Sequence, residues 1–407
     1  MPLPSKRLAF FLAAALLCAP SARALIIYGT GPTDVDNTRN TTAPASGAPW
    51  ANVVQIGTNN ASGVYLGNGY VLTANHVGLV GSILINGISY TIDGSFTPLQ
   101  ISEAPDYVDL KLFKIIGLPP LPVVQSLPLN FSATDLNVNC TIIGWGLGKG
   151  TVITNQGWNW GDNTTRAERW GTNKTLSSAT AVTPVAGYSY IYEALETNFN
   201  RSLGADTSEI SSGDSGSGLF QQFGGVWKLS GITTTVLQYQ AGSLSLYDAY
   251  APFYSNPPVF PQQADQSDAA NFVRLSKYAH LLRYENWASA KLGSATASAT
   301  ADADKDSSKN LLEYAFHTDP NAASARALPQ LGMESGFVTL TYPKLLSATD
   351  LTFVVEQSPD ASTGSWTPAP VTEETVATSG LTATIKAKVA ITTETKLFLR
   401  LSVTKLP

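Results

Sequence analysis

The sequence predicts a mainly β protein in which a larger β domain is followed by a small β-sandwich. Short apolar runs separated by Gly, Pro, Asn and Asp are typical of strands, and they recur at 53–56, 82–92, 110–116 and 227–236. Alternation of apolar and polar residues returns near the C-terminus, at 337–342, 351–356 and 396–403. A chain of 407 residues is too long for one compact core, and its 43% hydrophobic content is enough to fill two or three.

The first 24 residues have the pattern of a signal peptide. Lys6 and Arg7 precede an apolar stretch at 8–17, and residues 22–24 read Ala-Arg-Ala, which places the cleavage point after residue 24. The apolar stretch is shorter than the roughly 20 residues that span a bilayer. We therefore favour a signal peptide over a membrane anchor, and expect a secreted protein without a transmembrane segment.

The mature chain is acidic and has a single cysteine. Removing residues 1–24 takes away three positive charges and no negative one, so the net charge moves from −5 to −8. Binding to phosphate backbones needs a basic surface, so nucleic acid is not an expected partner. Cys18 leaves with the signal peptide, which excludes an internal disulfide. We expect Cys140 to be a small buried residue in a strand, with a reactive thiol as the alternative.

The β domain is expected to end in a helix and a linker. Apolar residues at 272, 275, 278, 279 and 282 would share one face of a helix over 269–290. The run of small residues at 293–301 cannot build a core and is typical of a flexible linker. The expected domains are therefore a β domain at 25–286, a linker with a loop and a short helix at 287–320, and an accessory β-sandwich at 321–407.

A serine stands between glycines at 211–218, which read Ser-Ser-Gly-Asp-Ser-Gly-Ser-Gly. Glycines lack Cβ atoms and let a substrate backbone approach closely, so Ser215 is the candidate nucleophile. The backbone N–H groups of Gly213 and Ser215 could then point at one developing oxyanion. A Gly/Ser-rich surface loop is the alternative interpretation.

A serine hydroxyl needs a base, and the mature chain offers His76, His280 and His317. His280 falls within the expected helix and His317 lies beyond the linker, whereas His76 follows an expected strand. An imidazole can accept the serine proton and later return it to the leaving amine. We assign His76 as the base, with an ordinary half-buried histidine as the alternative.

Two aspartates compete for the role of orienting the histidine. Asp109 begins the apolar run at 109–115, whereas Asp106 follows Pro105 in a segment typical of an exposed loop. A carboxylate at the mouth of a strand is well placed to fix an imidazole tautomer, so we favour Asp109. In the alternative interpretation, both aspartates are surface turn residues.

Six segments follow one another in the order of a known family. They are Thr73-Ala-Asn-His76, Asp109-Leu-Lys-Leu112, Gly144-Trp-Gly146, Gly213-Asp-Ser-Gly216, Ser230-Gly-Ile-Thr233 and Val273-Arg-Leu-Ser-Lys-Tyr278. On these residues the chain from Leu25 to Trp287 resembles the trypsin/chymotrypsin serine peptidases. The resemblance implies a chymotrypsin-like double antiparallel β-barrel with a C-terminal helix. It also implies cofactor-free hydrolysis of peptide or protein substrates through an acyl-enzyme, in a protein that we expect to be a monomer. Asn75 and Ser217 differ from the residues usual in the family, and its disulfides are missing.

The resemblance also implies roles around the serine. Asp214 would pair with an N-terminal amine, which signal cleavage before Leu25 could supply, and an internal partner is the alternative. Glu209 would form the base of the specificity pocket and favour Lys or Arg side chains. The alternative, in which the Glu209 side chain points to solvent, has the same weight as the pocket role. Thr234 and Val236 would line the pocket wall, where Val236 would narrow it.

A second candidate site lies in the linker. Side-chain oxygens fall at positions 1, 3, 5, 9 and 12 of a twelve-residue span, with a backbone carbonyl expected at position 7, from Asp302, Asp304, Asp306, Ser308, Asn310 and Glu313. This is the spacing of an EF-hand Ca²⁺ loop, although Ser307 replaces the usual glycine at position 6. The run from Asn310 to Pro320 resembles dockerin-like or thrombospondin-type calcium repeats. We place structural Ca²⁺ slightly ahead of the alternative, a solvated acidic linker.

The function that the sequence favours is a secreted serine endopeptidase. A non-catalytic binding or adhesion protein on the same scaffold is the alternative. A scaffold kept only for binding has no chemical need for all three of His76, Asp109 and Ser215, which argues for the enzyme.

Overall fold

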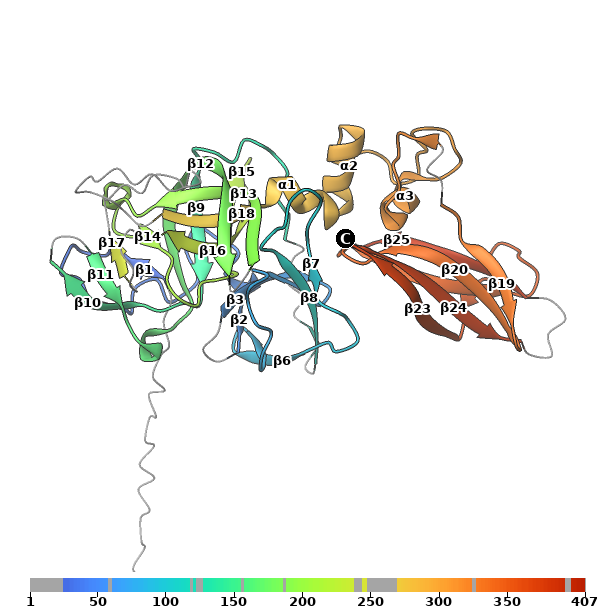
Figure 1. The fold of residues 1–407 in the computed structure, drawn as a ribbon, viewed down its shortest axis with the longest axis horizontal. Helices are drawn as coiled ribbons and strands as arrows, with labels where there is room; N and C mark the ends of the chain where they lie inside the picture. The colour runs from blue at the N-terminus through green and yellow to red at the C-terminus, as the bar shows by residue number, and fades with distance from the viewer. Residues whose placement is uncertain are drawn as a thin grey trace, which may run out of the picture.

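The computed structural model describes residues 25–57, 61–117, 120–121, 127–154, 157–185, 188–237, 244–246, 269–323, 327–391 and 397–406. The expected signal peptide lies outside these residues. The described chain is mainly β, with two barrels, a short helical segment and a C-terminal pair of sheets (Figure 1). No helix among the described residues is both long and apolar enough to cross a membrane.

The first barrel is an antiparallel sheet that closes on itself. Its strands pair in the order β4-β3-β2-β5-β6-β8, a further pairing of β4 with β8 completes the ring, and β7 adds to β8. The strands are β2 (Val53–Ile56), β3 (Ala61–Gly67), β4 (Tyr70–Thr73), β5 (Ile83–Ile85), β6 (Ile88–Ile92), β7 (Leu99–Gln100) and β8 (Lys111–Ile116). Alternate side chains such as Val54, Ile56 and Phe113 fill the interior, because successive residues of a strand face opposite sides.

The second barrel is closed by six strands in the order β12-β13-β18-β16-β15-β9. They are β9 (Asn139–Gly144), β12 (Arg169–Val185), β13 (Tyr188–Asn198), β15 (Gly218–Phe223), β16 (Val226–Leu237) and β18 (Ala269–Arg274). Short strands flank it, namely β1 (Ile26–Ile27) with β14 (Ser208–Glu209), and β10 (Lys149–Ile153) with β11 (Gly157–Trp160) and β17 (Leu244–Leu246). A shared core that includes Leu72, Leu112, Tyr192 and Phe220 joins the two barrels. The prediction of a chymotrypsin-like double barrel is confirmed.

The predicted helix over 269–290 is partly wrong. Residues 269–274 form strand β18, which pairs with both β13 and β16 and is buried throughout. Helical structure begins only afterwards, with α1 (Leu275–Tyr278) and α2 (Tyr284–Leu292). The barrel needs a sixth strand to satisfy the backbone groups of its neighbours, and this requirement overrides the local apolar spacing.

The C-terminal part contains two sheets that share one core. One sheet has the order β19-β20-β24-β23 and the other β22-β21-β25. The strands are β19 (Gln330–Glu334), β20 (Phe337–Leu345), β21 (Leu351–Ser358), β22 (Thr367–Pro368), β23 (Val371–Ser379), β24 (Thr382–Ala390) and β25 (Phe398–Lys405). Tyr342 and Ile385 of the first sheet pack with Val355 and Leu399 of the second, as in a β-sandwich.

Helix α3 (Asn310–Phe316) lies beside α2, between the barrels and the C-terminal sheets (Figure 1). The run of small residues at 293–301, which the sequence predicted to be a flexible linker, packs against its neighbours. The backbone N–H groups of Asn310 and Leu311 donate to the carbonyls of Ala301 and Ala299, and Ala297 and Ala299 pack on the aromatic cluster around α2. Small side chains allow this close approach, so the same composition that suggests flexibility here serves packing.

Candidate active site

The structure brings His76, Asp109 and Ser215 together where the two barrels meet. His76 follows β4 and Asp109 precedes β8 in the first barrel, whereas Ser215 lies in the loop between β14 and β15 of the second. Nδ1 of His76 is 2.7 Å from Oδ2 of Asp109, and Nε2 of His76 is 2.9 Å from Oγ of Ser215. The backbone N–H of His76 also donates to Oδ1 of Asp109, at 2.9 Å. Asp109 is fully buried, while 21% of the His76 side chain is exposed, so the imidazole bridges the interior and solvent.

The competing residues lie elsewhere. Oδ2 of Asp106 accepts a hydrogen bond from the hydroxyl of Tyr278, at 2.8 Å. Nε2 of His280 is 2.9 Å from Oε2 of Glu103, and His317 caps the C-terminus of α3 in a left-handed conformation. Asp106 therefore does not contact His76, and neither His280 nor His317 contacts Ser215, among the hydrogen bonds of the described residues.

The loop around Ser215 depends on its glycines. Gly213 has a φ of +92°, which favours glycine, and a Cβ there would lie 1.8 Å from Nη1 of Arg166. A Cβ on Gly216, whose φ is +87°, would meet the carbonyl oxygen of Ser62 at 2.1 Å. Within the described residues, the N–H groups of Gly213 and Ser215 donate to no protein acceptor, so both are available to an oxyanion.

Ser62 is a residue of the site that sequence reasoning missed. Its hydroxyl donates to the carbonyl of Gly213 at 3.0 Å and accepts from the N–H of Trp145 at 2.9 Å. Its own N–H donates to the carbonyl of Ser215, at 2.9 Å. Ser62 therefore holds the peptide group between Gly213 and Asp214 and the one between Ser215 and Gly216. It is on β3, about 150 residues away in the sequence, so only the barrel contact reveals it.

Asp214 is a buried carboxylate with internal hydrogen-bond donors. Oδ1 accepts from the N–H of Gly146 at 2.7 Å, and Oδ2 accepts from the N–H and the hydroxyl of Ser211 at 2.8 and 3.0 Å. Burial raises the pKa of Asp214 to about 6, although these hydrogen bonds and the positive charge of Arg166 act in the opposite direction. The internal alternative thus has partners in the structure, and the pairing with an N-terminal amine stays a prediction.

Residue 25 lies near this loop through strand β1. Ile26 pairs with Glu209 and Ile27 with Ser208, so the chain that follows Leu25 runs beside the approach to Ser215. Leu25 is 1% exposed and has a left-handed φ of +52°, a conformation that L-residues adopt at a cost. Its carbonyl accepts from Nη1 of Arg169, at 3.2 Å.

The candidate specificity residues are inside the second barrel region. Glu209 is fully buried, which excludes the solvent-exposed alternative, and its Oε1 accepts from the N–H of Ile210 at 2.9 Å. The hydroxyl of Tyr192 donates to Oγ1 of Thr234 at 2.6 Å, and Oγ1 of Thr234 donates to the carbonyl of Asn271 at 3.0 Å. Val236 is half-buried on β16. Residues 238–243 and 247–268, which follow it, lie outside the described part of the chain.

Asn75, which differs from the residue usual at its position, braces the histidine segment. Its amide donates to the hydroxyl of Tyr190 at 3.0 Å. The ring of Tyr190 stacks on Tyr107, with centroids 5.2 Å apart and planes 8° from parallel. Asn75 therefore ties the residue before His76 to strand β13 of the other barrel, a contact that its sequence position alone did not predict.

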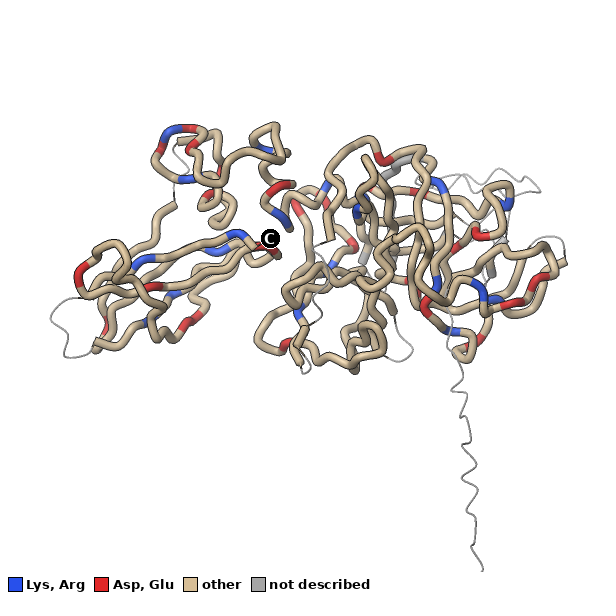
Figure 2. The backbone as a smooth tube through the Cα atoms, turned by 180° about the vertical axis from the view of Figure 1, so that it is seen from behind, with Lys and Arg blue, Asp and Glu red and all other residues tan. Residues whose placement is uncertain are grey.

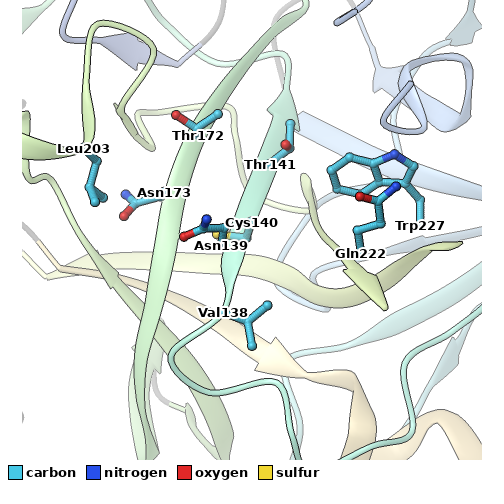
Figure 3. A pocket seen from close by; sticks show the side chains of 9 residues that line it. All are labelled: Val138, Asn139, Cys140, Thr141, Thr172, Asn173, Leu203, Gln222 and Trp227. Atoms are coloured by element: carbon cyan, nitrogen blue, oxygen red, sulfur yellow. The ribbon is translucent and has the colours of Figure 1, made fainter. Parts of the chain in front are cut away.

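Cys140 lies away from this site, in strand β9, as predicted. It is 3% exposed, and burial strongly raises the pKa of its thiol, which disfavours the reactive thiolate. It lines a cavity of about 610 Å³ together with neighbours on β9 and β12 (Figure 3). None of His76, Asp109 and Ser215 lines that cavity, so it is separate from the candidate active site.

One comparison with known protein families agrees with the fold. A family model described as Trypsin matches residues 37–258, more than half of the chain. Among solved structures, one similar chain is the murine norovirus NS6 protease, in an inactive mutant form with a C-terminal extension. It is 14% identical, covers 55% of this chain and 97% of its own, and has a TM-score of 0.30. None of the curated protein sequences matches this chain.

Proposed function

The chain belongs to the trypsin family, and we propose that it is a secreted serine endopeptidase in which His76, Asp109 and Ser215 act as the catalytic triad. The observation that carries the proposal is the continuous hydrogen-bonded chain from Asp109 through His76 to Ser215, with contacts of 2.7 and 2.9 Å. A peptidase domain implies peptide substrates. Secretion rests on the signal-peptide pattern of residues 1–24.

The proposed reaction follows from what each group can do at these distances. Nε2 of His76 takes the proton of the Ser215 hydroxyl while its Oγ attacks the scissile carbonyl carbon. Asp109, which is fully buried, holds the Nδ1–H tautomer and stabilises the imidazolium that forms. His76 then gives the proton to the leaving amine, which leaves an acyl-enzyme on Ser215. A water molecule, deprotonated by His76, hydrolyses the ester and restores the free hydroxyl.

The developing oxyanion would be held by the backbone N–H groups of Gly213 and Ser215. Both are uncommitted in the described part of the chain, and Ser62 holds the next peptide group, between Gly213 and Asp214, through the carbonyl of Gly213. Preorganised donors of this kind stabilise the transition state more than the ground state. Loss of one such donor in other enzymes costs about 10²–10³ in kcat.

For specificity, we propose that Glu209 forms the acidic base of the pocket, with Thr234 and Val236 on its wall. Its full burial at six residues before the nucleophile supports this role, because a buried carboxylate that receives a substrate Lys or Arg gains a charge-assisted partner. We also propose that Asp214 pairs with the amine of Leu25 once residues 1–24 are removed. The position of β1 beside β14 supports this step.

The proposal is tested by Ser215→Ala. This substitution removes the nucleophile and no core volume, so turnover of a peptide library should fall by about 10⁴-fold or more, while the circular dichroism spectrum is unchanged. Ser212→Ala is the matched control, because Ser212 is an exposed serine of the same loop and should leave turnover near wild type. Near-normal hydrolysis by purified Ser215→Ala would refute the assignment.

A further inference from the structure

Five side-chain oxygens between residues 302 and 313 are buried and have no hydrogen-bond partner among the described residues. They are Asp302 Oδ1, Asp304 Oδ2, Asp306 Oδ2, Asn310 Oδ1 and Glu313 Oε2. Oxygens of the three aspartates lie within 4.8 Å of one another. Figure 2 shows the charged residues of this loop close together on one turn of the backbone next to α3. A buried oxygen without a partner loses its hydration and gains no hydrogen bond in return, so five together require an explanation.

The other oxygen of each aspartate holds the loop in shape. Oδ2 of Asp302 accepts from the N–H of Ser307 at 2.8 Å, and Oδ1 of Asp304 accepts from the N–H of Asp306 at 3.2 Å. Oδ1 of Asp306 accepts from the N–H of Ser308, at 2.6 Å. Each carboxylate is therefore anchored by one oxygen, and its second oxygen is left for another partner.

The two remaining oxygens come from α3 and not from the acidic loop. Asn310 is 2% exposed, and its amide nitrogen donates to the carbonyl of Ser298 at 2.9 Å, which leaves Oδ1 as the free end. Glu313 is 1% exposed. Its Oε2 is buried without a hydrogen-bond partner among the described residues, as are the free oxygens of the three aspartates.

We propose that residues 302–313 bind one Ca²⁺ ion, with these five oxygens and the backbone carbonyl of Ser308 as ligands. Six or more oxygens from the protein suit Ca²⁺, whereas Mg²⁺ usually keeps several of its waters. Ser307, at the position where such loops have glycine, adopts the required left-handed conformation with a φ of +75°, so the substitution does not prevent the turn.

The ion would hold α3 in the joint between the barrels and the C-terminal sheets. Glu313 precedes Tyr314, whose ring packs on Tyr284 and Trp287 of α2 at centroid distances of 5.8 and 5.6 Å. The hydroxyl of Tyr314 donates to Oδ1 of the buried Asp350 at 3.2 Å, next to the C-terminal sheets. Calcium bound by Asn310 and Glu313 would thus fix the helix that connects the two parts.

Calorimetric titration of the full chain with CaCl₂, after treatment with chelator, tests the site. We expect one Ca²⁺ per chain, and a rise of at least about tenfold in Kd for Asp302→Asn and for Glu313→Gln, since charge and ligand number set affinity in such loops. Asp319→Asn is the matched control, because Asp319 also adds negative charge near Glu313 but supplies none of the five oxygens. Its Kd should stay within about threefold of wild type.

Thermal unfolding gives a second, independent readout. In chelator, Glu313→Gln should raise Tm above wild type because it removes one charge from a crowded cluster. In saturating calcium the same variant should melt below wild type, because a ligand is lost. Absence of calcium uptake by the folded wild-type chain, or unchanged affinity in both ligand variants, would overturn the site. The same sign of the Tm difference in both conditions would also contradict it.

Discussion

Asp214, next to Ser215 in the chain, is a buried carboxylate with a raised pKa. Its pKa of about 6 lies above the value of about 3.9 expected in an unfolded chain, so the folded chain holds the proton more tightly. The free energy of unfolding contributed by this group should therefore be greatest below pH 4 and should fall as the pH rises to about 6. The decrease is on the order of 3 kcal/mol.

This pH dependence discriminates between the two partners considered for Asp214. We expect it in a chain that retains residues before Leu25, measured by urea unfolding of the Ser215→Ala form to avoid self-cleavage. In a chain that starts at Leu25, the freed amine should lower the pKa of Asp214, abolish the decrease and, in active protein, raise kcat/KM. Identical pH profiles and activities in both chains would mean that the amine does not reach Asp214.

Glu209 should select basic side chains at the cleavage position. Glu209→Gln removes the charge and keeps the shape, so kcat/KM for Lys and Arg substrates should fall by about tenfold or more, while small apolar substrates are less affected. Val236→Ala is a useful comparison, because it should widen the pocket without changing its charge. Unchanged preference for Lys and Arg over apolar substrates in Glu209→Gln would place Glu209 outside the pocket.

At the scale of elements, strand β18 is fixed by a buried ion pair. Nε and Nη2 of Arg274 donate to the carboxylate of Asp135 at 2.6 to 3.1 Å, and both residues are at least 95% buried. Arg274→Met would leave the Asp135 charge with Ser276 as its side-chain donor. We expect a loss of about 3–5 kcal/mol in the free energy of unfolding, measured by urea denaturation.

An exposed ion pair, between Lys277 and Glu193, is the control for this buried ion pair. Lys277 contacts Glu193 at 2.9 Å, but 48% of its side chain is exposed. Lys277→Met should therefore cost less than about 1 kcal/mol. Equal losses for Arg274→Met and Lys277→Met would show that burial does not strengthen the dependence of β18 on its ion pair.

The sequence predicts individual elements well where one local pattern decides them. The runs at 53–56 and 110–116 coincide with β2 (Val53–Ile56) and β8 (Lys111–Ile116). The single run at 82–92 is divided by a turn into β5 (Ile83–Ile85) and β6 (Ile88–Ile92). The prediction for Ala269–Arg274 was wrong because its apolar residues fit two structures equally well, one face of a helix and a strand buried on both sides. Only the missing sixth strand of the barrel decides between them.

In the candidate site, too, residues in local motifs could be predicted from the sequence, and residues that act through tertiary contacts could not. Short motifs in chain order were enough to choose His76, Asp109 and Ser215, because each residue type has a specific chemical task. Ser62 and Arg166 could not be chosen in this way. Their contacts with Gly213 arise from barrel packing between residues far apart in the sequence, and neither stands in a distinctive local motif.

In the whole molecule, three packed units are joined at two places. The two barrels share a core, and Oγ of Ser215 in the second lies 2.9 Å from Nε2 of His76 in the first, so their relative orientation sets the geometry of the candidate site. The C-terminal unit meets the helical segment that follows β18 through Thr349, whose N–H and hydroxyl both donate to the carbonyl of Leu282. Ser347 donates to the carbonyl of Leu281 at 2.6 Å. Domain docking is therefore tight beside α2.

The central claim is that Ser215 is a nucleophile activated by His76, and covalent labelling with a fluorophosphonate tests it most directly. The reagent reacts with activated serines, and peptide mass spectrometry locates the adduct. We predict one adduct per folded chain, on Ser215, with labelling lost in Ser215→Ala and reduced by about 10³-fold or more in rate in His76→Ala. An adduct on another serine, or undiminished labelling in His76→Ala, would contradict the account.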